Sequence, residues 1–174
     1  MKLRTIPALL AVALLAGCSG ESADSQTTVS PDETIEVTTS ATPVFQAEEV
    51  DPITVPSGDS KIKDPGLNVE FIFRGTGYGS NGGSIIHIAV KNLNDAPLPT
   101  DAFKAPTLKI DDYNGSQTSI EPLSGDDNIP LDLPLGAGAT TNLQYAFNTS
   151  NGSLWSAEFH IGNVIYSGNL NNLA

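Results

Sequence analysis

The stretch AEFHIGNVIYSG, residues 157–168, decides the fold of this chain. Two runs of alternating apolar and polar residues flank the dipeptide Gly162-Asn163. A period of two is typical of β-strands, and two residues of this kind form a common hairpin turn. The stretch therefore predicts an antiparallel β-hairpin that turns at Gly162 and Asn163.

This turn also predicts the register of the hairpin. We expect Ile161 to pair with Val164 and Phe159 with Tyr166, with all four side chains on the core face. The same register extends on the core face through two further pairs, Ala157 with Gly168 and Trp155 with Leu170. It leaves on the opposite face Glu158, His160, Ile165 and Ser167.

Four further segments alternate and predict strands over 67–73, 84–92, 107–111 and 141–147, and a fifth strand over 116–123 is expected to return after the tight turn at Asn114 and Gly115. Their inward residues are Leu67, Val69, Phe71, Phe73, Ile86, Ile88, Val90, Leu108, Ile110, Leu143, Tyr145 and Phe147. No stretch from Asp64 onward combines a helical period with caps. About seven short strands in roughly 110 residues predict an all-β fold, an immunoglobulin-like antiparallel β-sandwich. A domain of this size can fold without a disulfide.

The first 17 residues have the pattern of a secretory signal peptide. Lys2 and Arg4 precede an apolar run over 6–15, which the small residues Ala16 and Gly17 close. About ten apolar residues are too few for a membrane span, which needs roughly 20. We therefore expect residues 1–17 to be removed rather than retained as a transmembrane helix.

The four residues Leu15, Ala16, Gly17 and Cys18 resemble the lipobox of bacterial prolipoproteins. The resemblance implies that the Cys18 thiol receives a diacylglyceryl group and that cleavage occurs just before this residue. Cys18 is the one cysteine of the chain, so an internal disulfide is excluded. Two acyl chains hold a protein stably on a membrane. We expect a protein anchored by lipid to the extracytoplasmic face of the cell membrane.

Residues 18–60 predict a disordered acidic linker. This segment holds nine Asp and Glu, no Lys or Arg and four prolines, and Phe45 is its one aromatic residue. An O-glycosylated stalk over the Thr-rich residues 34–42 is the alternative to a plain spacer. The β-sandwich domain is expected to span 61–174, a segment that contains eleven Asp and Glu and six Lys and Arg. We expect no nucleic-acid partner, because so few Lys and Arg cannot displace many phosphate counterions.

The order of strands and turns carries a family resemblance. The stretches IAVKNLNDAP (88–97), LKIDDYNG (108–115), LPLG (133–136) and LQYAF (143–147) hold the pattern. They are similar to the immunoglobulin-like domain, of unknown function, of small Gram-positive lipoproteins and secreted mycobacterial immunoprotective antigens. The chain departs from this pattern where Leu135 separates Pro134 from Gly136 and where no Val-Pro follows Phe147. The resemblance implies the fold, a surface location and antigenicity, and it carries over no catalytic residue.

Two loops are the candidate binding sites. The first is the glycine-rich stretch 75–83, with Tyr78 and Asn81, and the second is the acidic stretch 124–128, with Asp126 and Asp127. A phosphate cradle is excluded for the first loop, because a strand rather than a helix follows the glycines and no P-loop Lys is present. A rigid sandwich displays such loops for binding.

Metal and cofactor sites are not expected. A zinc site needs three or four ligands, and His87 and His160 could meet only if their strands are neighbours. Residues 112–115 resemble part of a calcium loop, but no Glu closes it at the usual spacing, so plain turns explain both this stretch and Asp126-Asp127. Calcium binding at these turns is the open alternative.

We expect a protein that is not an enzyme, because Ser153, Ser156 and Ser167 lie in no strand-to-helix elbow of the kind that a Ser-His-Asp triad uses. The function favoured by the sequence is binding or envelope organisation, with an envelope protein or a small ligand as the partner. The alternative is a carrier or chaperone for a small apolar ligand, which predicts a cavity between the two sheets. The oligomeric state does not follow from the sequence.

Overall fold

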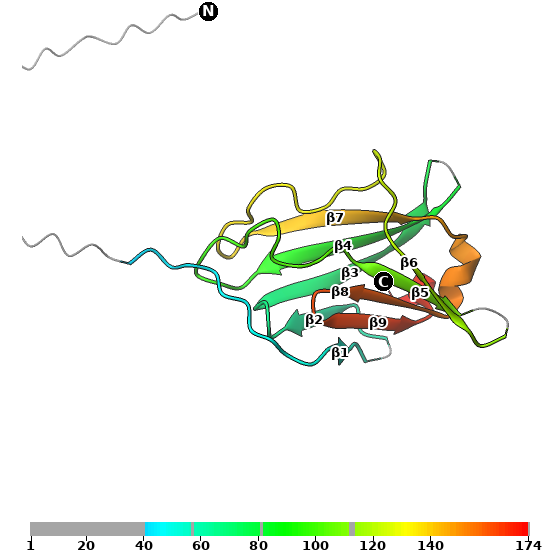
Figure 1. The fold of residues 1–174 in the computed structure, drawn as a ribbon, viewed down its shortest axis with the longest axis horizontal. Coiled ribbons are helices and arrows are strands. Elements are labelled where there is room, and N and C mark those ends of the chain that lie inside the picture. Colours follow the sequence, from blue (N-terminus) through cyan, green and yellow to red (C-terminus); the bar gives the residue numbers. More distant parts are fainter. Residues whose placement is uncertain (1–40, 57, 81, 112–113, 174) are drawn as a thin grey trace, which may run out of the picture. The chain divides into compact units, whose positions relative to one another are not determined.

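Nine β-strands form two sheets in the computed structural model, which describes residues 41–56, 58–80, 82–111 and 114–173 (Figure 1). The strands are β1 (Ile53–Thr54), β2 (Lys61–Asp64), β3 (Val69–Tyr78), β4 (Ser84–Asn92), β5 (Thr107–Asp111), β6 (Gln117–Ile120), β7 (Thr140–Phe147), β8 (Ala157–Ile161) and β9 (Val164–Gly168). Two short 3-10 helices follow β7 and β9, namely η1 (Asn151–Trp155) and η2 (Leu170–Asn172).

The two sheets form a β-sandwich. The five-stranded sheet has the order β1-β9-β8-β5-β6 and the four-stranded sheet has the order β2-β3-β4-β7. All neighbouring strands are antiparallel except β1 and β9, which are parallel. The predicted all-β sandwich is confirmed, with nine strands in place of about seven.

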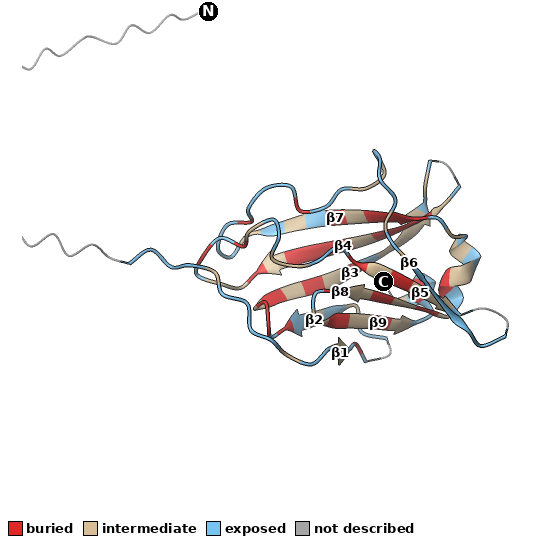
Figure 2. Ribbon diagram, viewed as in Figure 1, coloured by how far each residue is buried: buried red, intermediate tan, exposed pale blue. Residues whose placement is uncertain are grey.

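Alternating side chains of both sheets fill the interior. Burial alternates along the first half of β3 and along β8 and β9, whereas most residues of β4 and the end of β7 are buried (Figure 2). Aromatic rings meet across the two sheets, with ring centroids 5.3 Å apart for Phe73 and Tyr166 and 6.1 Å apart for Phe147 and Phe159. Each large side chain buried in this way stabilises the fold by about 1.5–3 kcal/mol.

The C-terminal hairpin has the predicted register from Ala157–Ile161 to Val164–Gly168. Gly162 has φ +57°, the left-handed conformation that such a turn requires at its first central residue. The prediction for Trp155 is wrong. This residue lies in η1 with 61% of its surface exposed, because the 3-10 turn interrupts the alternation before β8 and places Leu154 in the core instead.

The folded chain begins before Lys61, where the sequence placed the domain boundary. β1 pairs with β9, Val55 is buried, and Phe45 packs against the core. The backbone amide of Glu48 donates to the carbonyl of Gly66. The described part of the predicted linker therefore belongs to the sandwich from about the position of Phe45 onward.

Two other predicted boundaries differ from the structure. Strand β3 continues to Tyr78, so that the loop predicted over 75–83 is reduced to 79–83. A bulge between Phe73 and Gly75 lets the strand continue, because Gly75 adopts φ +112° there. Strand β6 is shorter than the predicted 116–123 and its residues are mostly exposed.

One end of the four-stranded sheet is closed by buried polar side chains. Asp64, Val69 and Asn92 lie side by side across β2, β3 and β4, and all three are fully buried. The Asp64 carboxylate accepts hydrogen bonds from the backbone amides of Gly66 and Leu67, and it also accepts from the amide and side chain of Asn163. Asp64 therefore joins the β2–β3 turn of one sheet to the β8–β9 turn of the other.

Asn92 organises the loops at the same end. Its side-chain amide donates to the carbonyls of Ala96 and Leu135 at 2.9 Å and of Gly136 at 3.1 Å. Its side-chain oxygen accepts from Asn94. Because a buried polar group must find partners, this side chain fixes the path of the three loop carbonyls, two of which also accept backbone amides, Leu135 from Leu98 and Gly136 from Ala139.

Candidate functional site

The two predicted binding loops meet at the other end of the four-stranded sheet. The Ser80 backbone amide and the Ser80 hydroxyl donate to the Asp127 carboxylate, each at 2.7 Å. Residues 79–83 connect β3 to β4, whereas Asp127 follows β6, so 47 positions separate the two partners. Asp127 thus holds together two loops that lie far apart in the sequence.

Hydrogen bonding shifts the titration of this carboxylate. The Ser80 hydroxyl, and after it the Ser80 amide, lower the pKa of Asp127 below its ordinary value. Both donors favour the ionised form, which is the state that accepts two hydrogen bonds. Asp127 is therefore a carboxylate at neutral pH.

The acidic loop is positioned by the edge of β7. The Leu123 amide donates to the Ala146 carbonyl, and Ile129 and Gln144 exchange two backbone hydrogen bonds. The Gln144 side chain also donates to the Asp127 carbonyl at 2.8 Å. Residues 123–129 are thus attached to β7 at both ends, and they cover the unpaired edge that an outer strand would otherwise expose.

A hollow of about 310 Å³ lies where the two loops meet. Its walls are Gly79, Gly83, Leu123, Ser124, Gly125, Asp126, Asp127, Asn128, Ala146 and Asn148. Glycines at Gly79 and Gly83 leave backbone rather than side chains on one wall. The first hollow therefore offers amides, carbonyls and two carboxylates.

A second hollow of about 470 Å³ adjoins the first, since both share Leu123, Ser124 and Asn128. Its other walls are Thr100, Phe103, Lys104, Ala105, Glu121, Pro122, Pro130, Leu131 and Tyr145. Burial raises the pKa of Tyr145, so its hydroxyl stays protonated. We call the two hollows together the loop groove. Each hollow lies within the range of small-molecule sites, about 300–1,000 Å³.

The predicted binding residues divide between the groove and its surroundings. Asp126 and Asp127 line the first hollow. Tyr78 ends β3 with 81% of its surface exposed and is not among the residues of either wall. Asn81 lies outside the described residues, as do the lipobox residues Leu15, Ala16, Gly17 and Cys18.

The two histidines do not meet. His87 is on β4 of the four-stranded sheet and His160 is on β8 of the five-stranded sheet. His160 instead lies 2.9 Å from the Glu158 carboxylate through its Nε2 atom. Asp112 and Tyr113 of the calcium-like stretch are outside the described residues. Within residues 41–56, 58–80, 82–111 and 114–173, no three His, Cys, Asp or Glu are grouped to hold a metal ion.

Several residues that line the groove or hold its loops together were not predicted as site residues. Ser80 carried no local signal, because its role depends on Asp127 in a distant loop. Phe103 and Leu131 lie in irregular segments without a strand period, and Tyr145 was assigned to the core. Apolar residues in proline-bounded loops are the signal that would have indicated Phe103 and Leu131.

Comparison with known proteins adds no relative. No protein-family model matches the chain, and searches of curated proteins and of solved structures found no significant match. In the described part of the chain, no helix is both long and apolar enough to span a membrane. The function is therefore argued from the loop groove and from the sequence of the N-terminus.

Proposed function

We propose that this protein is a lipid-anchored, non-catalytic binding protein of the extracytoplasmic membrane face. The observation that carries the proposal is the loop groove, which two distant loops form and which the Ser80–Asp127 contact holds together. A stiff sandwich with a core of interlocking aromatic side chains supports such loops. The partner in this proposal is an envelope protein.

The chemistry of the groove supports binding more than catalysis. Asp127 accepts two hydrogen bonds from Ser80 and has a lowered pKa, so it is a weak base. Catalytic acids and bases need pKa values near the working pH. The remaining walls offer amides, carbonyls, apolar surface and the charged side chains of Asp126, Glu121 and Lys104, which recognise a partner by shape, charge and hydrogen bonding.

The groove proposal is tested by affinity capture with the full-length chain from a detergent extract of the native envelope. Leu123→Arg places a long cation in the wall that both hollows share, and Leu133→Arg is the matched control at an exposed leucine that is not part of either wall. A partner captured by the wild type and by Leu133→Arg, but not by Leu123→Arg, supports the proposal. A partner retained equally by both variants contradicts it, as does no partner in an assay that recovers a known pair.

The anchor is tested separately at Cys18. The proposal predicts that the wild-type chain incorporates a labelled fatty acid and stays with the membrane fraction. Cys18→Ala abolishes the label and leaves the chain unprocessed or released. A labelled, membrane-bound Cys18→Ala chain would show that the lipobox assignment is wrong.

A second candidate function is the carriage of a small apolar ligand. The second hollow favours it, because Phe103, Leu131 and Tyr145 give it apolar walls. The walls of this hollow come from the segments 100–105 and 121–131 and from Tyr145 of β7, whereas the sequence placed the cavity between the two sheets, where aromatic pairs such as Phe147 and Phe159 meet. Solvent extraction of the purified full-length chain followed by mass spectrometry is expected to release an apolar compound that Leu123→Arg lacks. Extracts that are identical for the two proteins would exclude this function.

A further inference from the structure

The cations of the folded part are concentrated on one surface. Six Lys and Arg follow residue 60, at positions 61, 63, 74, 91, 104 and 109. Four of the six lie on the outer face of the four-stranded sheet, and we call these residues the basic face: Lys61, Lys63, Arg74 and Lys91. The chain as a whole has a net charge of -12, so this clustering opposes its overall charge.

Strand register explains the clustering. In β2, Ile62 and Asp64 face the interior, so Lys61 and Lys63 face outward. Lys63 is paired with Glu70, and Glu70 is paired in turn with Lys91 on the next strand. These three side chains therefore form one row across β2, β3 and β4.

The bulge in β3 adds the fourth cation. Phe73 is buried, and the register shifts between Phe73 and Gly75, which pairs with the outward His87. Arg74 is the extra residue and is exposed. In such a bulge two residues oppose one, so Arg74 joins the outer face next to Gly75.

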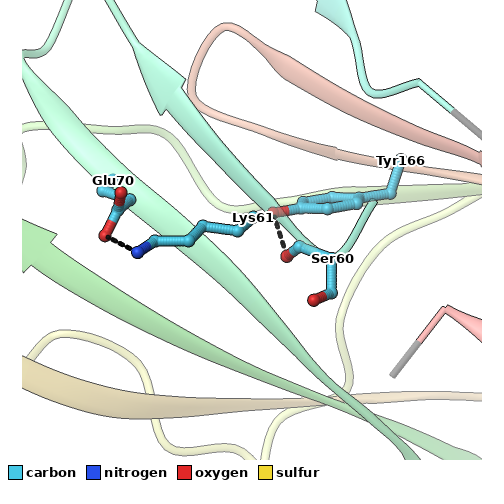
Figure 3. A network of polar contacts seen from close by, with 4 residues as sticks. All are labelled: Ser60, Lys61, Glu70 and Tyr166. Carbon is cyan, nitrogen blue, oxygen red and sulfur yellow. Dashed lines mark hydrogen bonds and ion pairs between the residues drawn. The ribbon is translucent and has the colours of Figure 1, made fainter. Parts of the chain in front are cut away.

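Glu70 is the one acid on this face among the residues of β2, β3, β4 and β7, because Asp64 points inward. Its carboxylate forms an ion pair with Lys61 Nζ (Figure 3), and the two atoms are 3.2 Å apart. On the other side of Lys61 in this view, the Tyr166 hydroxyl donates to the Ser60 carbonyl and fixes the start of β2 on the core. The Lys61 side chain is 59% exposed, and an exposed ion pair is weak. Among the residues of these four strands, four cations therefore stand beside one acid on the outer face.

We propose that the basic face docks on an anionic lipid surface. The cations are spread over the neighbouring strands β2, β3 and β4 rather than converging on one point, and the two described hollows of the loop groove have none of them in their walls. A flat array of cations is complementary to a flat array of headgroup phosphates. A small anion instead needs donors that converge on it.

The choice of a lipid surface as the partner rests on the proposed extracytoplasmic location of the protein. The contact between the basic face and the lipid does not itself require Cys18. A lipid anchor confines the domain near the membrane and turns docking into an intramolecular step with a high effective concentration. A weak basic face is then sufficient to orient the four-stranded sheet toward the headgroups.

The test measures sedimentation of the chain from Ser19 to Ala174, which retains every described residue, with lipid vesicles. Binding is expected to phosphatidylglycerol vesicles at low salt, to fall as salt screens the charges, and to be at least tenfold weaker for phosphatidylcholine. The double variant Lys63→Gln/Lys91→Gln is expected to lose about tenfold or more. The control Lys104→Gln/Lys109→Gln removes the same charge elsewhere and is expected to change binding less than threefold.

Thermal unfolding of each variant verifies that it folds. If Lys63→Gln/Lys91→Gln does not fold, the double variant Lys61→Gln/Arg74→Gln replaces it. The proposal is overturned by no binding to phosphatidylglycerol at low salt, by equal binding to both lipids, or by equal losses in the two double variants. Tighter binding to soluble polyphosphate than to vesicles at equal phosphate concentration would assign the face to a soluble polymer instead. Leu123→Arg changes the loop groove but not the basic face, so it is expected to bind vesicles as the wild type does. A failure of the groove proposal can therefore be distinguished from a failure of the lipid-docking proposal.

Discussion

At both ends of the four-stranded sheet, a polar side chain holds loop backbone through hydrogen bonds, but this side chain is buried at one end and lies near solvent at the other. At one end, the fully buried Asp64 and Asn92 hold loop backbone through hydrogen bonds. At the other end, Asp127 holds the Ser80 backbone and hydroxyl close to solvent. A hydrogen bond contributes most where its loss leaves a buried group without a partner. The first end is therefore expected to stabilise the fold, and the second to organise a surface that can adjust to a partner.

The largest effect is expected for Asn92→Asp. The substitution keeps the shape of the side chain but points an oxygen, in place of a donor, at the carbonyls of Ala96, Leu135 and Gly136. We expect a loss of about 4 kcal/mol in the free energy of unfolding, because a charge is buried against three carbonyl oxygens and the side-chain donor is lost, although Leu135 and Gly136 keep backbone donors. Urea denaturation measures it, with the exposed Asn142→Asp as the control. A loss as small as that of the control would contradict a stabilising role for this end.

Asp64→Ala is expected to follow, at about 2–3 kcal/mol. It removes the acceptor of four hydrogen bonds and with it the connection between the β2–β3 and β8–β9 turns. Asp59→Ala changes an exposed acid in the segment that precedes β2 and is expected to have little effect. Equal stability of the two variants in thermal denaturation would show that the buried carboxylate does not join the sheets.

Asp127→Ala is expected to separate groove binding from stability. The melting temperature should change by at most about 2 °C, because Asp127 is half-buried in a surface loop and its partner Ser80 is exposed, so that no buried donor is left without an acceptor. The amide of Ser80 loses its acceptor, so its hydrogen exchange should accelerate, and capture of the partner should weaken. Asp126→Ala, at the neighbouring acid, is the control. A large loss of stability would show that both ends of the sheet stabilise the fold.

The smallest effect is a pH dependence of the loop contact. The Ser80 hydroxyl and amide lower the pKa of Asp127 in the folded state, so the contact is fully present above the ordinary value of 3.8. It is lost only as the pH falls through the lowered pKa, because the protonated form accepts these bonds less well. The Ser80 amide resonance in NMR spectra should therefore be constant from pH 7 to pH 5. A shift within that range that Asp127→Ala removes would contradict the lowered pKa.

Strands with a clear alternation were predictable from the sequence, and the rest depended on long-range pairing. The 157–168 hairpin carries both its period and its turn, so its register followed from local chemistry. Strand β1 has two residues between prolines at 52 and 56, and only its parallel partner β9 makes it a strand. Trp155 continued the alternation in sequence, but the 3-10 turn of η1 placed it outside the core.

The candidate site was predictable in part. The loops around Asp126 and Asp127 and around residue 80 could be recognised from their composition, because glycine-rich and acidic stretches do not form strands. Their contact could not, since it depends on how β7 positions residues 123–129. The basic face was missed for the same reason. The six cations of residues 61–174 look dispersed in the sequence, and only the register of β2, β3 and β4 gathers four of them.

Native-state hydrogen exchange of the wild-type chain tests the central comparison most directly. The amides of Gly66, Leu67 and Asn163, which donate to buried Asp64, are predicted to exchange only through global unfolding. The amide of Ser80 is predicted to exchange faster, through local opening of the loop groove, although it donates to a carboxylate at a similar distance. Equal protection of Ser80 and Gly66 would contradict the division of the sheet into a stabilising end and an adjustable, binding end.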